Sequence, residues 1–237
     1  MVKIRCGITG QTGSIGRVLL KNGSFLKFES FKGDITKRKD VEKWIKENEF
    51  NYLIHLAAIV PIKEVNKDKK NAYNVNTLGT ENLINALINV RNKVRWVFFA
   101  STSHVYSTSK KKISEKSKIN PISFYGKTKY LAEKKLKRLS KNNIKVCIGR
   151  IFSTTNINQR KNYLVPDLKN KIKKKKGLIN LKNLNHYRDF ISIEDIAKII
   201  IYFLRKEISG IINLSTGKKT KLSSIANIIS RKYKKKI

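Results

Sequence analysis

A glycine-rich segment directly after an apolar run narrows the possible folds of this chain more than any other stretch. Residues Val2–Thr9 are mostly apolar or β-branched and predict a buried strand, and the run Arg17–Leu20 predicts a helix. Between them the chain reads Gly10-Gln11-Thr12-Gly13-Ser14-Ile15-Gly16. Glycines let a backbone approach a diphosphate closely, and the helix that follows offers free N–H groups. Because an ordinary strand-to-helix turn seldom needs three glycines at this spacing, we predict a phosphate-binding loop.

Apolar runs and amphipathic segments alternate along the rest of the chain. Further strands are predicted over Phe25–Phe31, Tyr52–Ala58, Val94–Ala100, Ile144–Ile148 and Gly210–Leu214. Helices are predicted around Val41–Ile45 and over Asn71–Asn89, Tyr125–Ser140 and Leu222–Ile229. This alternation predicts an α/β fold with a doubly wound (Rossmann) parallel sheet.

The charge balance raises the question of a polyanionic partner. The chain has 53 Lys and Arg against 16 Asp and Glu, a formal net charge of +37. Lysine runs occur at Lys110–Lys112, Lys173–Lys176 and Lys234–Lys236, but the other basic residues are dispersed. Aromatic residues are not interleaved with them, as base stacking would require. We attribute the charge to compositional bias, with a phosphate-bearing substrate benefiting from it, and expect no nucleic-acid partner.

The remaining composition excludes several classes of protein. No stretch is apolar enough to span a bilayer, so we expect no membrane partner. The first residues run straight into the predicted strand, which predicts the absence of a signal peptide. Cys6 and Cys147 both fall in predicted strands and are interpreted as reduced core residues, with no metal site. These features predict a cytoplasmic protein.

Candidate reacting groups lie on one predicted helix and at one strand end. Tyr125 and Lys129 lie one turn apart, and an ammonium near a phenol favours the phenolate. Such a pair also arises by chance on helices. The sequence Ser101-Thr102-Ser103-His104 follows a predicted strand, where open α/β sheets carry their chemistry. We interpret His55 as a core residue, whereas Asp34 is equally compatible with a cofactor contact and a turn cap.

These motifs together carry a resemblance to a known family. In chain order they are Thr9-Gly10…Gly13…Gly16, Gly33-Asp34-Ile35, His55-Leu56-Ala57-Ala58, Val75-Asn76 with Gly79-Thr80 and Asn82, Ser101-Thr102…Val105-Tyr106, Tyr125…Lys129, Arg150, and Arg188-Asp189-Phe190 with Glu194-Asp195. The chain resembles the extended short-chain dehydrogenase/reductases, in the nucleotide-sugar epimerase/dehydratase/reductase branch. The resemblance covers almost the whole chain.

The resemblance implies an NAD or NADP cofactor and assigns roles to individual residues. The implied cofactor-binding residues are Gly10, Thr12, Gly13, Ser14, Ile15 and Gly16 at the diphosphate, Asp34 and Ile35 on the adenine side, and Leu56, Ala57, Ala58, Asn76, Tyr125 and Lys129 towards the nicotinamide ribose. The implied catalytic residues are Thr102, Tyr125, Lys129 and His104, and the implied substrate-binding residues are Thr102, Ser103, His104, Ser153 and Arg188.

Three departures from the family pattern limit what can be carried over. Dehydratases of this branch carry Asp-Glu after the threonine, whereas Ser103-His104 stands here, so dehydration is disfavoured. Ser153 replaces an asparagine of the pattern, with Asn156 further on. The chain also ends soon after the last predicted helix, which predicts either a small substrate-binding portion or a shortened gene. His104 itself is compatible with two roles, an acid/base group or a hydrogen-bonding wall residue.

The resulting prediction is an NAD(P)-dependent epimerase or reductase that acts on a nucleotide-activated sugar. The alternative is a non-catalytic dinucleotide sensor or scaffold with a basic, polyanion-binding surface. We expect a dinucleotide-binding domain over residues 1–150 and a short substrate-binding portion over 151–237, partly interleaved with the first. By resemblance we also expect a homodimer formed through the helices at 71–89 and 125–140.

Overall fold

A computed structural model describes residues 3–60, 62–90, 93–155, 163–174, 181 and 184–234. The chain forms two compact units. The first contains Met1–Ile151 and Ile193–Leu214, and the second contains Phe152–Ser192 and Ser215–Ile237. The first segment of the first unit therefore ends at Ile151, close to the boundary expected at residue 150. Residues 193–214 then belong to the first unit again. Asn156 lies outside the described residues.

The first unit is built on a six-stranded sheet whose neighbouring strands are all parallel. In spatial order its strands are β2 (Leu26–Ser30), β1 (Ile4–Thr9), β3 (Tyr52–His55), β4 (Trp96–Thr102), β5 (Lys145–Ile151) and β9 (Gly210–Leu214). The chain passes from β1 to β2 on one side and then crosses to β3 on the other. Doubly wound sheets bind their ligands at such a reversal, beyond the carboxyl ends of the two strands, here β1 and β3. The predicted fold class is confirmed.

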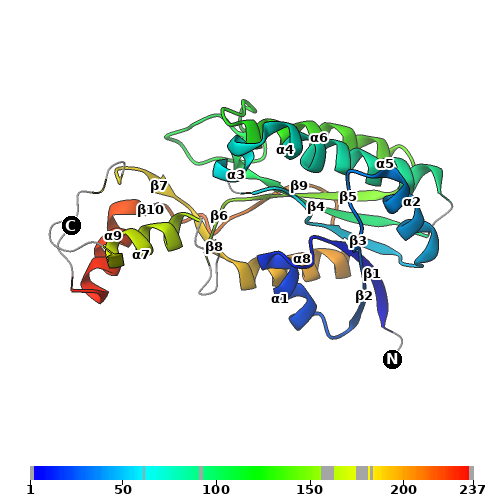
Figure 1. Ribbon diagram of the computed structural model, residues 1–237, viewed down its shortest axis with the longest axis horizontal. Helices are drawn as coiled ribbons and strands as arrows, with labels where there is room; N and C mark the ends of the chain where they lie inside the picture. Colours follow the sequence, from blue (N-terminus) through cyan, green and yellow to red (C-terminus); the bar gives the residue numbers. More distant parts are fainter. Residues whose placement is uncertain are drawn as a thin grey trace. The chain divides into compact units, whose positions relative to one another are not determined.

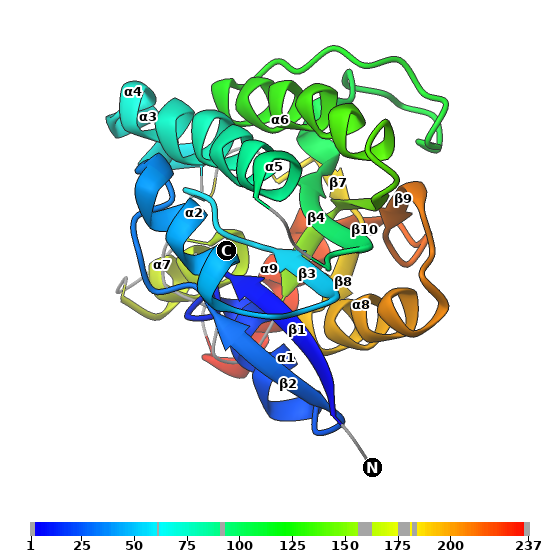
Figure 2. The same cartoon turned by 90° about the vertical axis from the view of Figure 1, so that its right-hand side faces the viewer.

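Helices cover both faces of this sheet (Figures 1 and 2). One face carries α2 (Arg38–Glu47), α5 (Gly79–Asn89) and α6 (Phe124–Ser140), and the other carries α1 (Ser14–Asn22) and α8 (Ile193–Lys206). Val41, Leu83, Phe99 and Leu136 belong to one buried apolar cluster between the sheet and the first set of helices. Each such side chain stabilises the fold by about 1.5–3 kcal/mol through burial. Because helices cover both faces of the sheet, its central strands consist almost entirely of apolar residues.

Several predicted elements differ in their bounds from those observed, and strand β3 ends at His55 and not at Ala58. Strand β4 ends at Thr102 and not at Ala100, because β5 continues to pair with it as far as Ile151. The predicted helix over 71–89 is observed as α4 (Lys69–Tyr73), a π-helical turn η1 (Asn74–Leu78) and α5. The wider turn presents Asn76 and Thr77 together to α6, where both donate hydrogen bonds to Thr128. The short helix α3 (Ile62–Lys67), which precedes α4, was not predicted.

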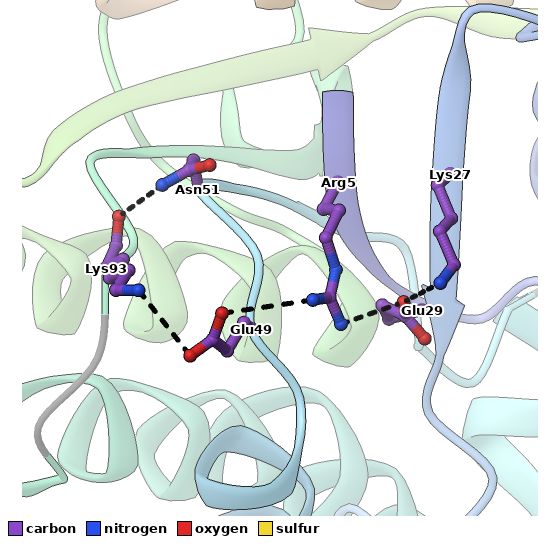
Figure 3. Close-up of polar contacts among 6 residues, drawn as sticks. All are labelled: Arg5, Lys27, Glu29, Glu49, Asn51 and Lys93. Carbon is purple, nitrogen blue, oxygen red and sulfur yellow. Dashed lines mark hydrogen bonds and ion pairs between the residues drawn. The ribbon is translucent and has the colours of Figure 1, made fainter. Parts of the chain in front are cut away.

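Ion pairs join β1 to β2 and to the segment ahead of β3 (Figure 3). Arg5 of β1 contacts Glu29 of β2 at 3.2 Å and Glu49 ahead of β3 at 3.9 Å. Lys27 also contacts Glu29, and Lys93 contacts Glu49. The partners are partly or largely exposed, so each pair contributes only about 0–1 kcal/mol.

The second unit is small and is described here by itself. Strand β6 (Ser153–Thr155) pairs in parallel with β8 (Phe190–Ser192), and β7 (Tyr187–Arg188) pairs antiparallel with β10 (Thr220–Lys221). Helix α7 (Leu164–Lys174) contributes Leu168 and Ile172 to a core shared with Ala226 of α9 (Leu222–Lys232). Among the described residues of the whole chain, no helix is long and apolar enough to cross a membrane.

Candidate active site

The glycine loop packs against the chain that follows β3. Gly10 has φ +73°, and a Cβ there would lie 2.6 Å from the amide nitrogen of Ala57. A Cβ at Gly16 would lie 2.6 Å from the carbonyl oxygen of Gly10, which also accepts a hydrogen bond of 3.0 Å from the Gly13 amide. Glycine is therefore required at 10 for the loop to close against Leu56 and Ala57, and at 16 for helix α1 to pack against the loop itself.

The loop also provides what a diphosphate needs. Helix α1 begins at Ser14 and has Gly13 at its N-cap, so no side chain caps its first amides, and its first turn has no acidic residue. A Cβ at Gly13 would meet only the Gly10 carbonyl oxygen, at 3.1 Å. The first amides of a helix lack partners within the helix and attract an anion. The residues present, including half-buried Ser14 and Ile15 and exposed Thr12, thus fit the diphosphate of a dinucleotide.

Asp34 and Ile35, expected on the adenine side, have clear local contacts. The Asp34 carboxylate is exposed and accepts hydrogen bonds from the Thr36 amide at 2.9 Å and hydroxyl at 2.7 Å. These bonds lower the pKa of Asp34. The side chain of Ile35 is buried, and a Cβ at Gly79 would lie 2.8 Å from it. Asp34 therefore caps its own turn, which was one of the two roles considered for it from the sequence. Its contact with a cofactor stays a prediction.

His55 is the core histidine that the sequence predicted. Its Nε2 lies 3.0 Å from the Thr80 hydroxyl, which donates to the Asn76 carbonyl at 2.9 Å. Because that proton is already used, Nε2–H must donate and Nδ1 must accept from the Thr9 hydroxyl, 2.6 Å away. Burial lowers the pKa of His55 to about 3, which keeps the ring neutral. This chain of bonds fixes the end of β1, since Thr9 in turn accepts from the Ala57 amide.

Asn76 continues the same framework towards α6. Its Oδ1 accepts from the Ile59 amide at 2.7 Å, and its Nδ2 donates to the Ile59 carbonyl and to the Thr128 hydroxyl, each at 3.2 Å. The side chain is fully buried. Asn76 thus ties the segment after β3 to the helix that carries Tyr125 and Lys129, and its predicted contact with the cofactor is not required to explain its position.

Tyr125 and Lys129 are both buried on one face of α6. The helix begins at Phe124, where the Ser123 hydroxyl caps it by accepting from the Gly126 amide at 3.1 Å. The Tyr125 ring packs with Val65 and Ala72. Lys129 is 1% exposed and its Nζ lies 4.0 Å from the centre of the Phe99 ring. Burial lowers the pKa of Lys129 from 10.5 to about 7, although the charge of Glu133 opposes this shift.

The end of β4 lies against the first turn of α6. Thr102 is buried, and its hydroxyl accepts a hydrogen bond of 3.3 Å from the His104 amide at the start of the short 3-10 helix η2 (Ser103–Val105). The rings of His104 and Tyr125 meet edge to face, with centroids 5.9 Å apart. His104 thus links the two elements, since its amide donates to Thr102 and its ring meets that of Tyr125. Half-buried Ser103 lies between Thr102 and His104 in the chain, and the predicted catalytic roles of Thr102, His104, Tyr125 and Lys129 remain predictions.

Gly126 permits this approach, although no motif in the sequence singled it out. A Cβ at position 126 would overlap the carbonyl oxygen of His104. We expect Gly126→Ala to destabilise the fold by about 1–3 kcal/mol and to lower kcat by about 100-fold, because the first turn of α6, which carries Tyr125, would be pushed away from His104. Thermal unfolding and steady-state kinetics test this, with Lys127→Ala on the exposed side of the same turn as control. Wild-type kinetics for Gly126→Ala would contradict it.

The two substrate-binding residues predicted outside the sheet lie in the second unit. Ser153 starts β6, and its amide donates to the Asp189 carbonyl at 3.0 Å. Arg188 ends β7 and is exposed. Next to it, the Asp189 carboxylate accepts from the amides of Thr216 and Gly217, which holds the turn before β10. Their predicted contact with substrate remains a prediction.

Sequence reasoning missed Glu133, a charged residue on the face of α6 that carries Tyr125 and Lys129. Glu133 is 4% exposed and binds Arg150, which the motif pattern included without a role. The signal was available, because Tyr125, Lys129 and Glu133 follow one another at intervals of four residues along one helix face.

Comparison with known proteins now identifies the family. Residues 6–215 match the model of the NAD-dependent epimerase/dehydratase family. The chain belongs to this family. The resemblance inferred from the motifs is thereby confirmed, and so is the cofactor class, NAD or NADP, since the family is NAD-dependent and the glycine loop fits the cofactor.

Individual relatives show how far the sequence similarity extends. A GDP-6-deoxy-D-talose 4-dehydrogenase from Aggregatibacter actinomycetemcomitans is 29% identical over 89% of this chain and 74% of its own length. A putative UDP-glucose 4-epimerase from Methanocaldococcus jannaschii is 26% identical over 88% of this chain and 69% of its own length.

Among solved structures, RMD from Pseudomonas aeruginosa complexed with NADPH has a TM-score of 0.87 at 19% identity, covering 100% of this chain and 83% of its own. A UDP-glucose 4-epimerase from Thermus thermophilus in complex with NAD has a TM-score of 0.85 at 20% identity, covering 98% of this chain and 84% of its own. At these sequence identities, the structural similarity shows the fold alone.

Proposed function

We propose that this protein transfers a hydride at a ring carbon of a nucleotide-activated sugar, as an epimerase or a reductase. The observation that carries the proposal is the joint burial of Tyr125 and Lys129 on one face of α6, beside Thr102 and His104. Burying the Lys129 ammonium costs free energy of folding, and a lysine with a purely structural role would be exposed. Buried ionisable groups with shifted pKa values are common at functional sites.

Each residue has a distinct part in the proposed chemistry. Tyr125 moves a proton to or from the reacting sugar oxygen, and the Lys129 ammonium stabilises the phenolate. The Thr102 hydroxyl hydrogen-bonds the same sugar oxygen. The bound nicotinamide supplies the hydride chemistry. No acidic pair follows Thr102, since Ser103 and His104 stand there, so we propose no dehydration step.

The relatives support a nucleotide sugar as the substrate. One is named for a GDP-deoxysugar dehydrogenase and another for a UDP-glucose epimerase. We propose that the Arg188 guanidinium binds the substrate diphosphate, for which its planar fork is suited, and that Ser153 contacts the sugar nucleotide. We also propose that the protein is a cytoplasmic homodimer formed through α5 and α6.

Release of the cofactor on denaturation tests the proposal and separates its two forms. The purified protein is denatured, NAD and NADP are measured in the supernatant, and GDP-, UDP- and dTDP-hexoses are then assayed by NMR of the products. An epimerase is expected to retain about one equivalent of NAD and to need no added cofactor. A reductase is expected to consume added NADH or NADPH with a keto-sugar. Failure of every nucleotide sugar to react would refute the proposed function.

His104 is proposed as a second proton-transfer group, since its ring meets that of Tyr125. We expect His104→Ala to lower kcat by about 100-fold while KM changes less than about threefold, because general acid–base catalysis contributes about 10²–10⁴-fold. Steady-state kinetics measure both constants. The exposed His186 of the second unit provides the control, His186→Ala. If His104→Ala raised KM alone, its role would be that of a wall residue.

A further inference from the structure

A buried carboxylate, that of Glu133, lies on the same helix face as Tyr125 and Lys129. Glu133 is 4% exposed and one turn beyond Lys129 on α6. Its Oε1 accepts from the Arg150 Nε at 3.1 Å and its Oε2 accepts from the Arg150 Nη2 at 2.7 Å. The Ser101 hydroxyl also donates to Oε1. Since Ser101 directly precedes Thr102, this one carboxylate connects the helix of Tyr125 to the strand end of Thr102.

Arg150 extends these contacts across the sheet. It lies on β5, is 2% exposed, and donates through Nη1 to the Tyr106 hydroxyl at 2.9 Å. The Tyr106 hydroxyl donates in turn to Asn213 Oδ1 of β9 at 2.7 Å. The guanidinium also lies 4.8 Å from the centre of the Tyr106 ring. Glu133 and Arg150 thus join α6 to β4, β5 and β9 at the carboxyl ends of the strands.

A fully buried ion pair is a poor device for stability alone. The desolvation of two charges offsets most of their attraction, and well-packed apolar side chains would serve the core at least as well. What the pair provides is a fixed geometry, through two parallel hydrogen bonds, and a charge close to Lys129 that is balanced by its partner.

We propose that Glu133 and Arg150 are positioning residues of the active site, which fix the Tyr125–Lys129 face against Thr102 and keep the charge beside Lys129 balanced. The inference rests on the proposed function for the roles of Tyr125 and Lys129. Neither Glu133 nor Arg150 touches the reacting atoms; both act through the residues that do.

Other titratable groups near Lys129 do not replace this pair. His55 of β3 is neutral because burial lowers its pKa to about 3. Tyr106 has its pKa raised by burial and remains a phenol. His104 of η2 lies at the Tyr125 end of the face. Glu81 of α5 faces Lys135 at 2.8 Å, where both side chains are about 30% exposed.

The charges of Glu133 and Arg150 can be removed separately, and the two substitutions should shift the pH at which Lys129 loses its proton in opposite directions. Glu133→Gln leaves the Arg150 cation unbalanced, so Lys129 should lose its proton at lower pH. Arg150→Gln leaves the Glu133 anion unbalanced, so Lys129 should keep its proton to higher pH. We expect each midpoint to move by about one pH unit or more, in opposite directions, because a charge within a few ångströms acts on this scale.

NMR titration of protein labelled with ¹³C-lysine measures these midpoints without substrate or added cofactor. The Lys129 Cε resonance is assigned by its loss in Lys129→Met. The control is Glu81→Gln, which removes a partly exposed ion pair to the same helix and should leave the midpoint unchanged. Midpoints that stay in place, or that move in the same direction in both variants, would overturn the proposal.

The double variant Glu133→Gln/Arg150→Gln covers the case in which a single variant does not fold. It removes both charges, so the Lys129 midpoint should stay close to that of the wild type. We expect kcat to fall about tenfold with KM nearly constant, because the tie between α6 and Ser101 is weakened. A double variant with wild-type kcat would overturn the positioning role.

If the wild type turned over no nucleotide sugar while the midpoints moved as expected, the proposed function would fail and the charge coupling would stand.

Discussion

Tyr125→Phe is expected to lower kcat by about 1,000-fold or more while leaving the fold intact. The change removes only the phenolic oxygen, which we propose transfers the proton to or from the sugar. The ring itself packs with Val65 and Ala72, and phenylalanine preserves that packing, so the melting temperature should change by no more than about 2 °C. Steady-state kinetics and thermal unfolding of the same preparation measure the two quantities.

The matched control for this change lies on the same helix. Tyr130 is half-buried and its ring faces Lys134, with Nζ 5.3 Å from the ring centre. Tyr130→Phe should retain wild-type kcat. If Tyr125→Phe also retained its rate on the best nucleotide sugar, Tyr125 would not be the proton-transfer group, and the non-catalytic alternative would become the better account.

Lys129→Met is expected to abolish activity and yet to stabilise the protein at pH 6. The pKa of Lys129 is about 7 in the folded protein, against 10.5 for an unperturbed lysine. Below pH 7 both the folded and the unfolded protein carry the charge, so the folded state bears the full cost of burying it. Between pH 7 and 10.5 the folded protein releases the proton and the unfolded chain keeps it, so wild-type stability rises with pH in this window.

Methionine fills a similar volume without a charge and has no such dependence on pH. We therefore expect Lys129→Met to raise the free energy of unfolding by about 2–4 kcal/mol at pH 6, with the difference shrinking towards pH 10. Urea unfolding at a series of pH values measures it. Lys127→Met, in the exposed part of the same helix, should leave the free energy of unfolding within about 0.5 kcal/mol. A destabilised Lys129→Met variant at pH 6 would contradict this account of the buried charge.

Local patterns predicted most of the fold because the strands of a covered parallel sheet read as apolar runs. Val97, Phe98 and Phe99 are all essentially inaccessible, which explains why β4 was evident from the sequence. The π-helical turn at Asn74–Leu78 was not evident, since it depends on hydrogen bonds from Asn76 and Thr77 to Thr128, some fifty residues away. Such contacts leave no periodic trace along the chain.

The sequence by itself determined the doubly wound fold, the glycine loop and the family, because each depends on residue types at short spacings within one segment. It also placed Tyr125 and Lys129 on one helix face, since helical geometry alone requires that. The tertiary structure decided how that face is completed: Gly126 lets His104 approach, His55 is held neutral between Thr9 and Thr80, and Glu133 meets Arg150. These contacts join separate strands and helices, so the packing of those elements decides them and local sequence does not.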